Sequence, residues 1–270
     1  MNSAVALEVA TQTHPGMTRS HNEDALHIDT GVGLVILADG MGGYRAGEVA
    51  SGMAVEQMSV SLAGLSPTCN SHEKIDDEQV RMYLIDGVSA ANQAIYSAAR
   101  NQPRFAGMGT TLVAAWFYGD RMSVIHVGDS RLYRLQGERF EQLTRDHSFI
   151  QEQIDSGLIS LEDARHSSNR NLVTRALGVD AAVEPDVSSF EVHAGDLFLL
   201  CSDGLNDMVE DDDIARILLQ AGSLEQAADE LVRQANENGG WDNISVILVK
   251  VPTGNSTSQG RWNKLRNWLK

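Results

Sequence analysis

The fold is decided by residues 32–43, which read Val32-Gly33-Leu34-Val35-Ile36-Leu37-Ala38-Asp39-Gly40-Met41-Gly42-Gly43. The first part is a short apolar run rich in β-branched residues, which is typical of a buried strand. The run stops at the carboxylate of Asp39, and a glycine follows directly. An Asp-Gly pair at a strand end is by itself consistent with an ordinary turn.

The same arrangement recurs at three other places in the chain. Asp129 follows the apolar residues 124–128, and Asp203 follows the apolar residues 197–202. Asp242 stands just before the apolar run 244–249. Four carboxylates at the ends of four predicted core strands indicate one common rim. Carboxylates that crowd together repel one another, so such a rim needs cations.

Composition sets the broad class of the protein. The chain of 270 residues, 42% hydrophobic and 21% charged, is typical of a globular protein with one large or two small domains. A net charge of −16 argues against nucleic acid as a partner, because phosphate binding needs a basic surface. Two cysteines make no disulfide framework, and we see no signal peptide and no apolar run near the ~18 residues that cross a membrane. We therefore expect a cytoplasmic protein.

The predicted strands and helices come in clusters. Strands are expected at 5–13, 25–28 and 32–39, then helices at 46–62 and 76–101, a meander at 112–118, 122–127, 131–135 and 140–143, strands at 186–192 and 197–202, helices at 211–220 and 223–236, and a last strand that ends near 251. Clusters of this kind favour the α+β class over strict βαβ alternation. Residues 144–180 carry short helical patterns broken by glycine, which indicates an inserted lid rather than more sheet.

The composition changes after Pro252. Residues 253–260 are small and polar, as in a linker, and residues 261–270 carry four basic and no acidic residues. The tail is either a solvated extension or a short helix for a membrane surface or a partner. We expect one domain, 1–252, followed by this linker and tail, 253–270.

The aspartates are candidate ligands for a hard metal ion. Mg²⁺ and Mn²⁺ prefer carboxylate, carbonyl and water oxygens, which Asp39, Asp203 and Asp242 could supply. Gly40 has no side chain, so its carbonyl can approach a metal closely. Two ions that share one carboxylate would lower the pKa of a water between them and supply a nucleophile near neutral pH. Spacing alone leaves a metal site and four separate turn aspartates both open.

Arg19 is a candidate for binding phosphate. Its planar guanidinium can bind a phosphate with two parallel hydrogen bonds, and it lies in a polar segment with Glu23 and Asp24. An arginine near acidic residues is also the ordinary composition of a surface salt bridge, which contributes little. The segment alone does not decide between the two.

Taken together, the motifs resemble a known family. Arg19 is followed after two residues by Asn22-Glu23-Asp24, and then come the strand ending in Asp39-Gly40-Met41-Gly42-Gly43 and four further motifs in order: Gly107-Met108-Gly109-Thr110-Thr111, Val127-Gly128-Asp129-Ser130-Arg131, Cys201-Ser202-Asp203-Gly204-Leu205 and Trp241-Asp242-Asn243. This order resembles that of the bacterial PP2C-family (PPM) serine/threonine phosphatases. The resemblance runs from about Thr11 to Val251.

The resemblance implies a four-layer αββα sandwich, with two central antiparallel sheets, flanking helix pairs and a flap at about 146–180. It also implies two Mn²⁺ or Mg²⁺ ions at one end of the sandwich, and a third, looser ion in many bacterial members. The resemblance implies that Asp39 bridges the two ions, that the carbonyl of Gly40 is a ligand, and that Asp203 and Asp242 are further ligands. It implies that Asp24 contacts metal-bound water, with Glu23 close behind, and that Asp129 and Asp203 bind the third ion. Arg19 would bind the phosphate of the substrate.

The implied reaction is hydrolysis of phosphoserine and phosphothreonine in proteins by in-line attack of a metal-bridging hydroxide. The partners would be phosphoproteins, including a serine/threonine kinase and its targets, and we expect a monomer. Two alternatives are a catalytically silent regulatory module and a hydrolase of small phosphate esters. Met41 stands where animal members carry a histidine proposed as general acid, so that role is unassigned. A third-ion water near Asp129 is our hypothesis for it.

Overall fold

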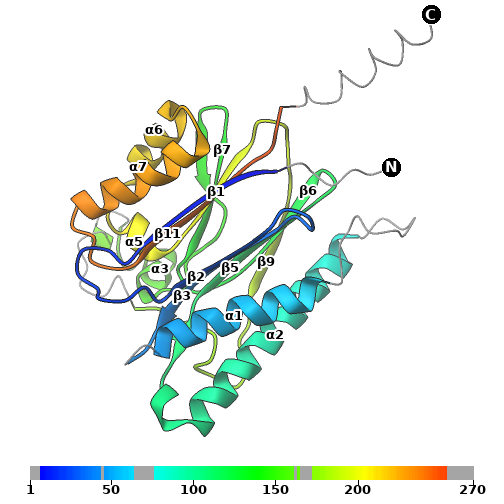
Figure 1. The fold of residues 1–270 in the computed structure, drawn as a ribbon, viewed down its shortest axis with the longest axis vertical. Coiled ribbons are helices and arrows are strands. Elements are labelled where there is room, and N and C mark those ends of the chain that lie inside the picture. The colour runs from blue at the N-terminus through cyan, green and yellow to red at the C-terminus, as the bar shows by residue number, and fades with distance from the viewer. Residues whose placement is uncertain (1–6, 44–45, 64–75, 161–162, 165–171, 254–270) are drawn as a thin grey trace, which may run out of the picture.

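The computed structural model describes residues 7–43, 46–63, 76–160, 163–164 and 172–253 (Figure 1). The loop 64–75 and the basic tail 261–270 lie outside the described residues, as does the linker beyond residue 253. Among the helices of the described ranges, none is long and apolar enough to cross a membrane.

Two antiparallel sheets form the centre of the molecule. The first has the order β1 (Glu8–His14), β11 (Ile244–Lys250), β10 (Leu197–Cys201), β7 (Arg131–Gln136) and β8 (Arg139–Gln142). The second has the order β2 (Asp24–Asp29), β3 (Leu34–Met41), β5 (Leu112–Tyr118), β6 (Arg121–Val127) and β9 (Asp186–Glu191), and β4 (Gly109–Thr110) pairs with the end of β3. The predicted strands are thus confirmed, with bounds that shift by a few residues.

Helices cover the outer faces of both sheets (Figure 1). The second sheet carries α1 (Ala46–Ala63) and α2 (Asp77–Asn101), and the 3-10 turn η1 (Pro103–Phe105) follows. The first sheet carries α5 (Asp203–Asn206), α6 (Asp211–Gln220) and α7 (Leu224–Glu237). Asp76 begins α2 with a reciprocal capping box to Gln79, and Ser223 caps α7 by accepting from the N–H of Gln226.

Three apolar cores separate the four layers. Alternate side chains of β5 point to opposite faces, because successive residues of a strand do so. Phe117 faces the other sheet and packs edge to face on Phe198, with ring centroids 5.4 Å apart. Trp116 faces α1 and α2. On the other outer face, Tyr133 packs in a core with residues of α6 and α7, such as Leu231. The predicted αββα sandwich is confirmed.

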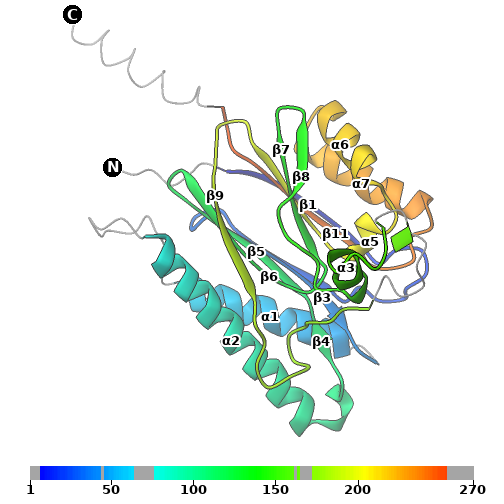
Figure 2. The ribbon, with the colours of Figure 1, turned by 180° about the vertical axis from the view of Figure 1, so that it is seen from behind.

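The segment between β8 and β9 contains the predicted flap, of which residues 146–160, 163–164 and 172–180 are described. Its helix α3 (Phe149–Asp155) begins at Ser148, whose hydroxyl accepts from the N–H of Gln151 over 3.3 Å. An isolated bridge between Ser148 and Val173 joins the two arms of the segment to each other, and a bridge between Thr110 and Leu177 joins the second arm to β4. Figure 2 shows α3 beside α5 at one end of the sandwich.

Candidate active site

The carboxylates predicted to share one rim line a single cleft of about 570 Å³. Of the residues predicted for the site, the cleft is lined by Arg19, Glu23, Asp39, Gly40, Asp129, Asp203 and Asp242. The remaining lining residues are Ser20, His21, Met41, Gly42, Thr111, Val173 and Asn243. Asp24 lies behind this lining rather than on it.

Strand pairing explains why these residues gather. Asp39 lies two residues before the end of β3 and stands opposite Asp24, the first residue of β2. Asp203 directly follows the loop after β10, and Asp242 lies two residues before β11, which pairs with β10. Asp129 lies in the short connection between β6 and β7. Because the strands are antiparallel, these starts and ends fall at the same edge of the sandwich.

The paired carboxylates of Asp24 and Asp39 are strongly perturbed. The hydroxyl of Ser202 donates to Asp24 Oδ2 over 2.9 Å. Burial raises the pKa of Asp24 to about 6. The pKa of Asp39 is raised well above its ordinary value, first by burial and then by the negative charges of Asp24 and Asp203. Without a cation, burial and mutual repulsion therefore shift both carboxyl groups towards the protonated form.

Two carboxylate oxygens in this group have no internal partner. Asp24 Oδ1 and Asp203 Oδ1 are buried, and within the described part of the chain neither accepts a hydrogen bond. Buried polar atoms almost always have a partner, so each such oxygen requires an explanation. Burial, followed by the charge of Asp129, also raises the pKa of Asp203 well above its ordinary value. A site built only of oxygen donors, with excess negative charge, fits a hard divalent cation.

The backbone at the end of β3 is tightly held. The N–H of Asp39 donates to Thr111 Oγ1 over 3.0 Å, and the N–H of Gly40 donates to the carbonyl of Glu23 over 3.1 Å. A Cβ atom at position 40 would lie 2.2 Å from the carbonyl oxygen of Gly47 and 2.6 Å from that of Glu23. Glycine is therefore required at position 40 by packing as well as by any carbonyl ligand role.

Asn243 fastens the N-terminal loop to this edge of the sandwich. Its side-chain amide donates to the carbonyls of Pro15 and His21 over 3.0 Å and 2.8 Å. Its Oδ1 accepts from the N–H of Glu23 over 2.7 Å. This loop carries Arg19, whose Nη2 donates to Asp242 Oδ2 over 2.7 Å. The hydrogen bond and the negative charge of Asp242 raise the pKa of Arg19. Asn243 was quoted in a motif but was not assigned a role from the sequence.

Asp129 lies at the boundary between the cleft and a second cavity. That cavity, about 250 Å³, is lined by Asp129, Asp203 and residues of α3 and α6. Burial, followed by the charge of Asp146, raises the pKa of Asp129 to about 7. Asp129 and Asp203 thus face the same space, as the predicted third-ion pair requires.

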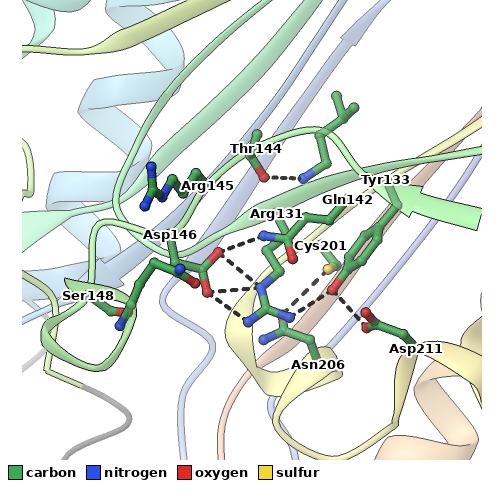
Figure 3. A network of polar contacts seen from close by, with 12 residues as sticks. Arg131, Tyr133, Gln142, Thr144, Arg145, Asp146, Ser148, Cys201, Asn206 and Asp211 are labelled. Atoms are coloured by element: carbon green, nitrogen blue, oxygen red, sulfur yellow. Dashed lines mark hydrogen bonds and ion pairs between the residues drawn. The ribbon is translucent and has the colours of Figure 1, made fainter. Parts of the chain in front are cut away.

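A network that sequence reasoning missed holds the wall of this cavity (Figure 3). Arg131 Nε donates to both carboxylate oxygens of Asp146 at 3.0 Å, and Nη2 donates to Oδ2 at 2.7 Å. Arg131 Nη1 donates to the hydroxyl of Tyr133, which donates to Asp211 Oδ1 over 3.2 Å. The network ties β7 to the root of the lid and to the start of α6. Only the closeness of Arg131 to Asp129 in the sequence could have pointed to it.

A separate cluster joins His126, His147 and Asp186 near the root of the lid. The two imidazoles stack with centroids 4.7 Å apart, and His126 Nε2 donates to the carbonyl of Arg145. Arg175 Nη1 lies 3.3 Å from His147 Nε2 and 3.2 Å from Asp186 Oδ1. Because a guanidinium already neutralises this cluster, it is a structural anchor of the lid and no part of the carboxylate site.

Comparison with known proteins agrees with this geometry. Residues 16–248 match the family model of protein phosphatase 2C. The serine/threonine phosphatase stp of Listeria welshimeri is 39% identical over 88% of this chain and 94% of its own length. The crystal structure of the Mycobacterium tuberculosis serine/threonine phosphatase PstP/Ppp is 38% identical, covers 91% of this chain and 99% of its own, and superposes with a TM-score of 0.81. A structure of the PstP catalytic domain in complex with two manganese ions is 37% identical, covers 91% and 98% of the two chains, and gives a TM-score of 0.79. The chain therefore belongs to the protein phosphatase 2C family.

Proposed function

We propose that this protein is a metal-dependent phosphatase that removes phosphate from phosphoserine and phosphothreonine in other proteins. The observation that carries the proposal is the cleft in which half-buried carboxylates with unpartnered oxygens stand beside an exposed arginine. The carboxylates suit divalent cations, and the arginine suits the phosphate that such cations activate. Relatives that are 39% and 38% identical over the aligned residues are named serine/threonine phosphatases.

The proposed ligands of two core Mn²⁺ or Mg²⁺ ions are Asp39, Asp203, Asp242 and the carbonyl of Gly40. Asp24 would hold a metal-bound water behind Asp39, with Glu23 next to it. A third ion would bind between Asp129 and Asp203. The PstP catalytic domain in complex with two manganese ions supports the proposal of two core ions. When bound, the ions would supply Lewis acidity and lower the pKa of a water held between them.

The residues of this chain then have separate tasks. Arg19 would bind two oxygens of the substrate phosphate, which stabilises the charge that develops on them during transfer. Asp242 holds that guanidinium at the edge of the cleft until substrate arrives. Asn243 and Thr111 keep the two loops of the cleft in place. Met41 lines the cleft but has no proton to give, so we assign leaving-group protonation to the neighbourhood of Asp129.

The partners follow from this function as proposals. The substrates would be phosphoproteins, including a serine/threonine kinase and the targets of that kinase. We propose that the protein acts as a monomer in the cytoplasm. Its low cysteine content supports the cytoplasmic location. The net charge of −16 and the acidic cleft support the exclusion of nucleic acid.

The test is phosphate release from a phosphothreonine peptide compared with small phosphate esters, with added Mn²⁺ and with EDTA. We expect metal-dependent turnover of the peptide. A silent regulatory module would release no phosphate from any of these compounds, and a small-ester hydrolase would release phosphate from the esters alone. The presence of Arg19, Asp39, Asp203 and Asp242 in the cleft argues against a silent module.

A further inference from the structure

We propose that Met17 and Trp241 form an apolar rim that contacts an apolar side chain next to the phosphorylated residue of a substrate protein. The proposal rests on the proposed phosphatase function and specifies the substrate class of the same cleft. We call these two residues the apolar rim. No role follows for them from the carboxylate site, because neither lines its cleft.

Both side chains are large, apolar and exposed. Met17 is 69% exposed and Trp241 is 59% exposed. Single exposed apolar residues are common on protein surfaces, and Met82 on α2 is one such case in this molecule. Met17 and Trp241 differ from it, because both lie at one turn beside residues that line the cleft, and exposed apolar side chains next to a polar site are typical of a binding surface.

The turn at Gly239 and Gly240 holds the two side chains in neighbouring positions. The N–H of Met17 donates to the carbonyl of Gly240 over 2.7 Å. A Cβ atom on Gly240 would lie 2.9 Å from Met17 Cγ, and one on Gly239 would lie 2.7 Å from Trp241 Nε1. The two side chains therefore lie over consecutive glycines, in space that a side chain there would fill.

The two glycines also have conformations that require glycine. Their φ angles are +134° and +53°, and the first is outside the range of ordinary L-residues. Gly16, just before Met17, packs so closely that a Cβ atom on it would lie 2.2 Å from the carbonyl oxygen of Asp242. The backbone that carries the rim is thus placed by direct contact between two segments far apart in the chain.

The rim is continuous with the phosphate site. Arg19 lies two residues after Met17, and Asp242 directly follows Trp241. The 2.7 Å contact between Arg19 and Asp242 closes the link between the two segments. An extended peptide advances about 3.4 Å per residue, so a residue one or two positions from a phosphate held by Arg19 reaches the neighbourhood of the rim. An indole and a thioether make adaptable apolar contacts, which suits a leucine-like or methionine-like side chain.

The test uses paired phosphothreonine peptides that differ only in whether leucine or serine occupies the positions on either side of the phosphothreonine. We expect wild-type protein to prefer the leucine peptides. In Met17→Ala and in Trp241→Ala, KM for the leucine peptides rises about five- to tenfold, as expected for loss of one apolar contact. The serine peptides and p-nitrophenyl phosphate are turned over as before, and Trp241→Phe keeps most of the preference. Met82→Ala, a methionine 55% exposed on another face, is the matched control and changes nothing.

Two results overturn the proposal. An equal loss on peptides and on p-nitrophenyl phosphate means that the rim only supports the Arg19 loop. An unchanged preference in both alanine variants, or a change of oligomeric state in sedimentation with no change in preference, means that the rim does not contact substrate. Failure of the protein phosphatase function itself is distinct, because wild-type protein with Mn²⁺ would then hydrolyse neither the leucine peptides nor the serine peptides.

Discussion

Arg19 Nη2 lies 2.7 Å from Asp242 Oδ2 and joins the proposed phosphate-binding residue to a proposed metal ligand 223 positions away. The side chains are 57% and 33% exposed, so the ion pair contributes little to the stability of the fold. Its interest lies in the proposed function, in which one carboxylate would serve two cations. An ion bound by Asp242 would weaken the hold of this carboxylate on the guanidinium and leave Arg19 available to phosphate.

Arg19→Ala is therefore expected to act on substrate binding. We expect KM for a phosphothreonine peptide to rise about ten- to a hundredfold with a smaller fall in kcat, because a charge-assisted double hydrogen bond is lost. Mn²⁺ affinity, measured by calorimetry, is expected to be unchanged or higher, since Asp242 no longer has a competing partner. Arg19→Lys serves as the control and recovers part of the loss. A weaker Mn²⁺ affinity in Arg19→Ala with unchanged KM would contradict this account.

The stability of the metal-free protein is expected to fall as pH rises. The pKa of Asp129 is about 7 in the folded protein against an ordinary value of 3.8, so the folded state binds this proton more tightly than the unfolded chain. The stability that the proton contributes is complete below the ordinary pKa and is lost as pH rises through about 7. Asp24, with a pKa of about 6, adds to the same trend.

Asp129→Asn isolates the contribution of that one group. At pH 8 and without metal, we expect the variant to be more stable than wild type by about 1–3 kcal/mol, and at pH 5 we expect a smaller difference, because less of the proton's contribution is lost there. Urea unfolding at both pH values measures the difference. The lowered pKa of His147 produces an opposite trend at low pH, but it is common to both proteins and cancels. Equal stability of the two proteins at pH 8 would contradict the raised pKa.

Asp129 is also expected to matter most for poor leaving groups. Threonine leaves as an alkoxide that needs a proton, whereas p-nitrophenolate does not. Asp129→Ala should therefore lower kcat for a phosphothreonine peptide by about tenfold or more relative to its effect on p-nitrophenyl phosphate. Steady-state kinetics with saturating Mn²⁺ gives the ratio. Full activity on both substrates would remove Asp129 from the account of leaving-group protonation.

The Arg131–Asp146 network is expected to stabilise the protein. Asp146 is 7% exposed, and Asp146→Ala leaves a guanidinium with three fewer hydrogen bonds in a largely enclosed place. We expect a loss of about 1–3 kcal/mol in the free energy of unfolding, measured with urea. Arg233→Ala, which removes exposed ion pairs on α7, is the matched control and is expected to change the free energy of unfolding much less, because exposed ion pairs contribute little. Equal effects of the two substitutions would contradict a structural role for the network.

The sequence was sufficient to predict the layers of the fold and the main acidic residues of the site. Short apolar runs predicted most of the strands, and Asp39, Asp203 and Asp242 were recognisable because each lies close to an end of such a run. Pairing between strands was not recognisable, so the placement of Asp24 behind Asp39 emerged only from the register of β2 and β3.

Contacts between distant segments could not be predicted either, because they also depend on tertiary packing. The Arg131–Asp146 pair depends on how the chain turns between β7 and the lid, and no local pattern marks it. Met17 and Trp241 lie 224 positions apart, and only the docking of two loops brings them to one turn. A local sequence pattern reflects the secondary-structure preference of one segment. The Arg131–Asp146 pair and the apolar rim depend instead on how two distant segments pack together.

The most direct test of the central claim measures metal content and turnover on the same samples of wild type and Asp39→Asn. Wild-type protein equilibrated with Mn²⁺ and passed through a desalting column is expected to hold about two ions per chain by mass spectrometry and to release phosphate from a phosphothreonine peptide. Asp39→Asn, which keeps the size of the side chain and removes its charge, is expected to hold fewer ions and to lose at least about a hundredfold in kcat. Turnover that persists in Asp39→Asn, or in metal-stripped wild type with EDTA present, would contradict the claim that the carboxylates of this cleft hold the ions that drive hydrolysis.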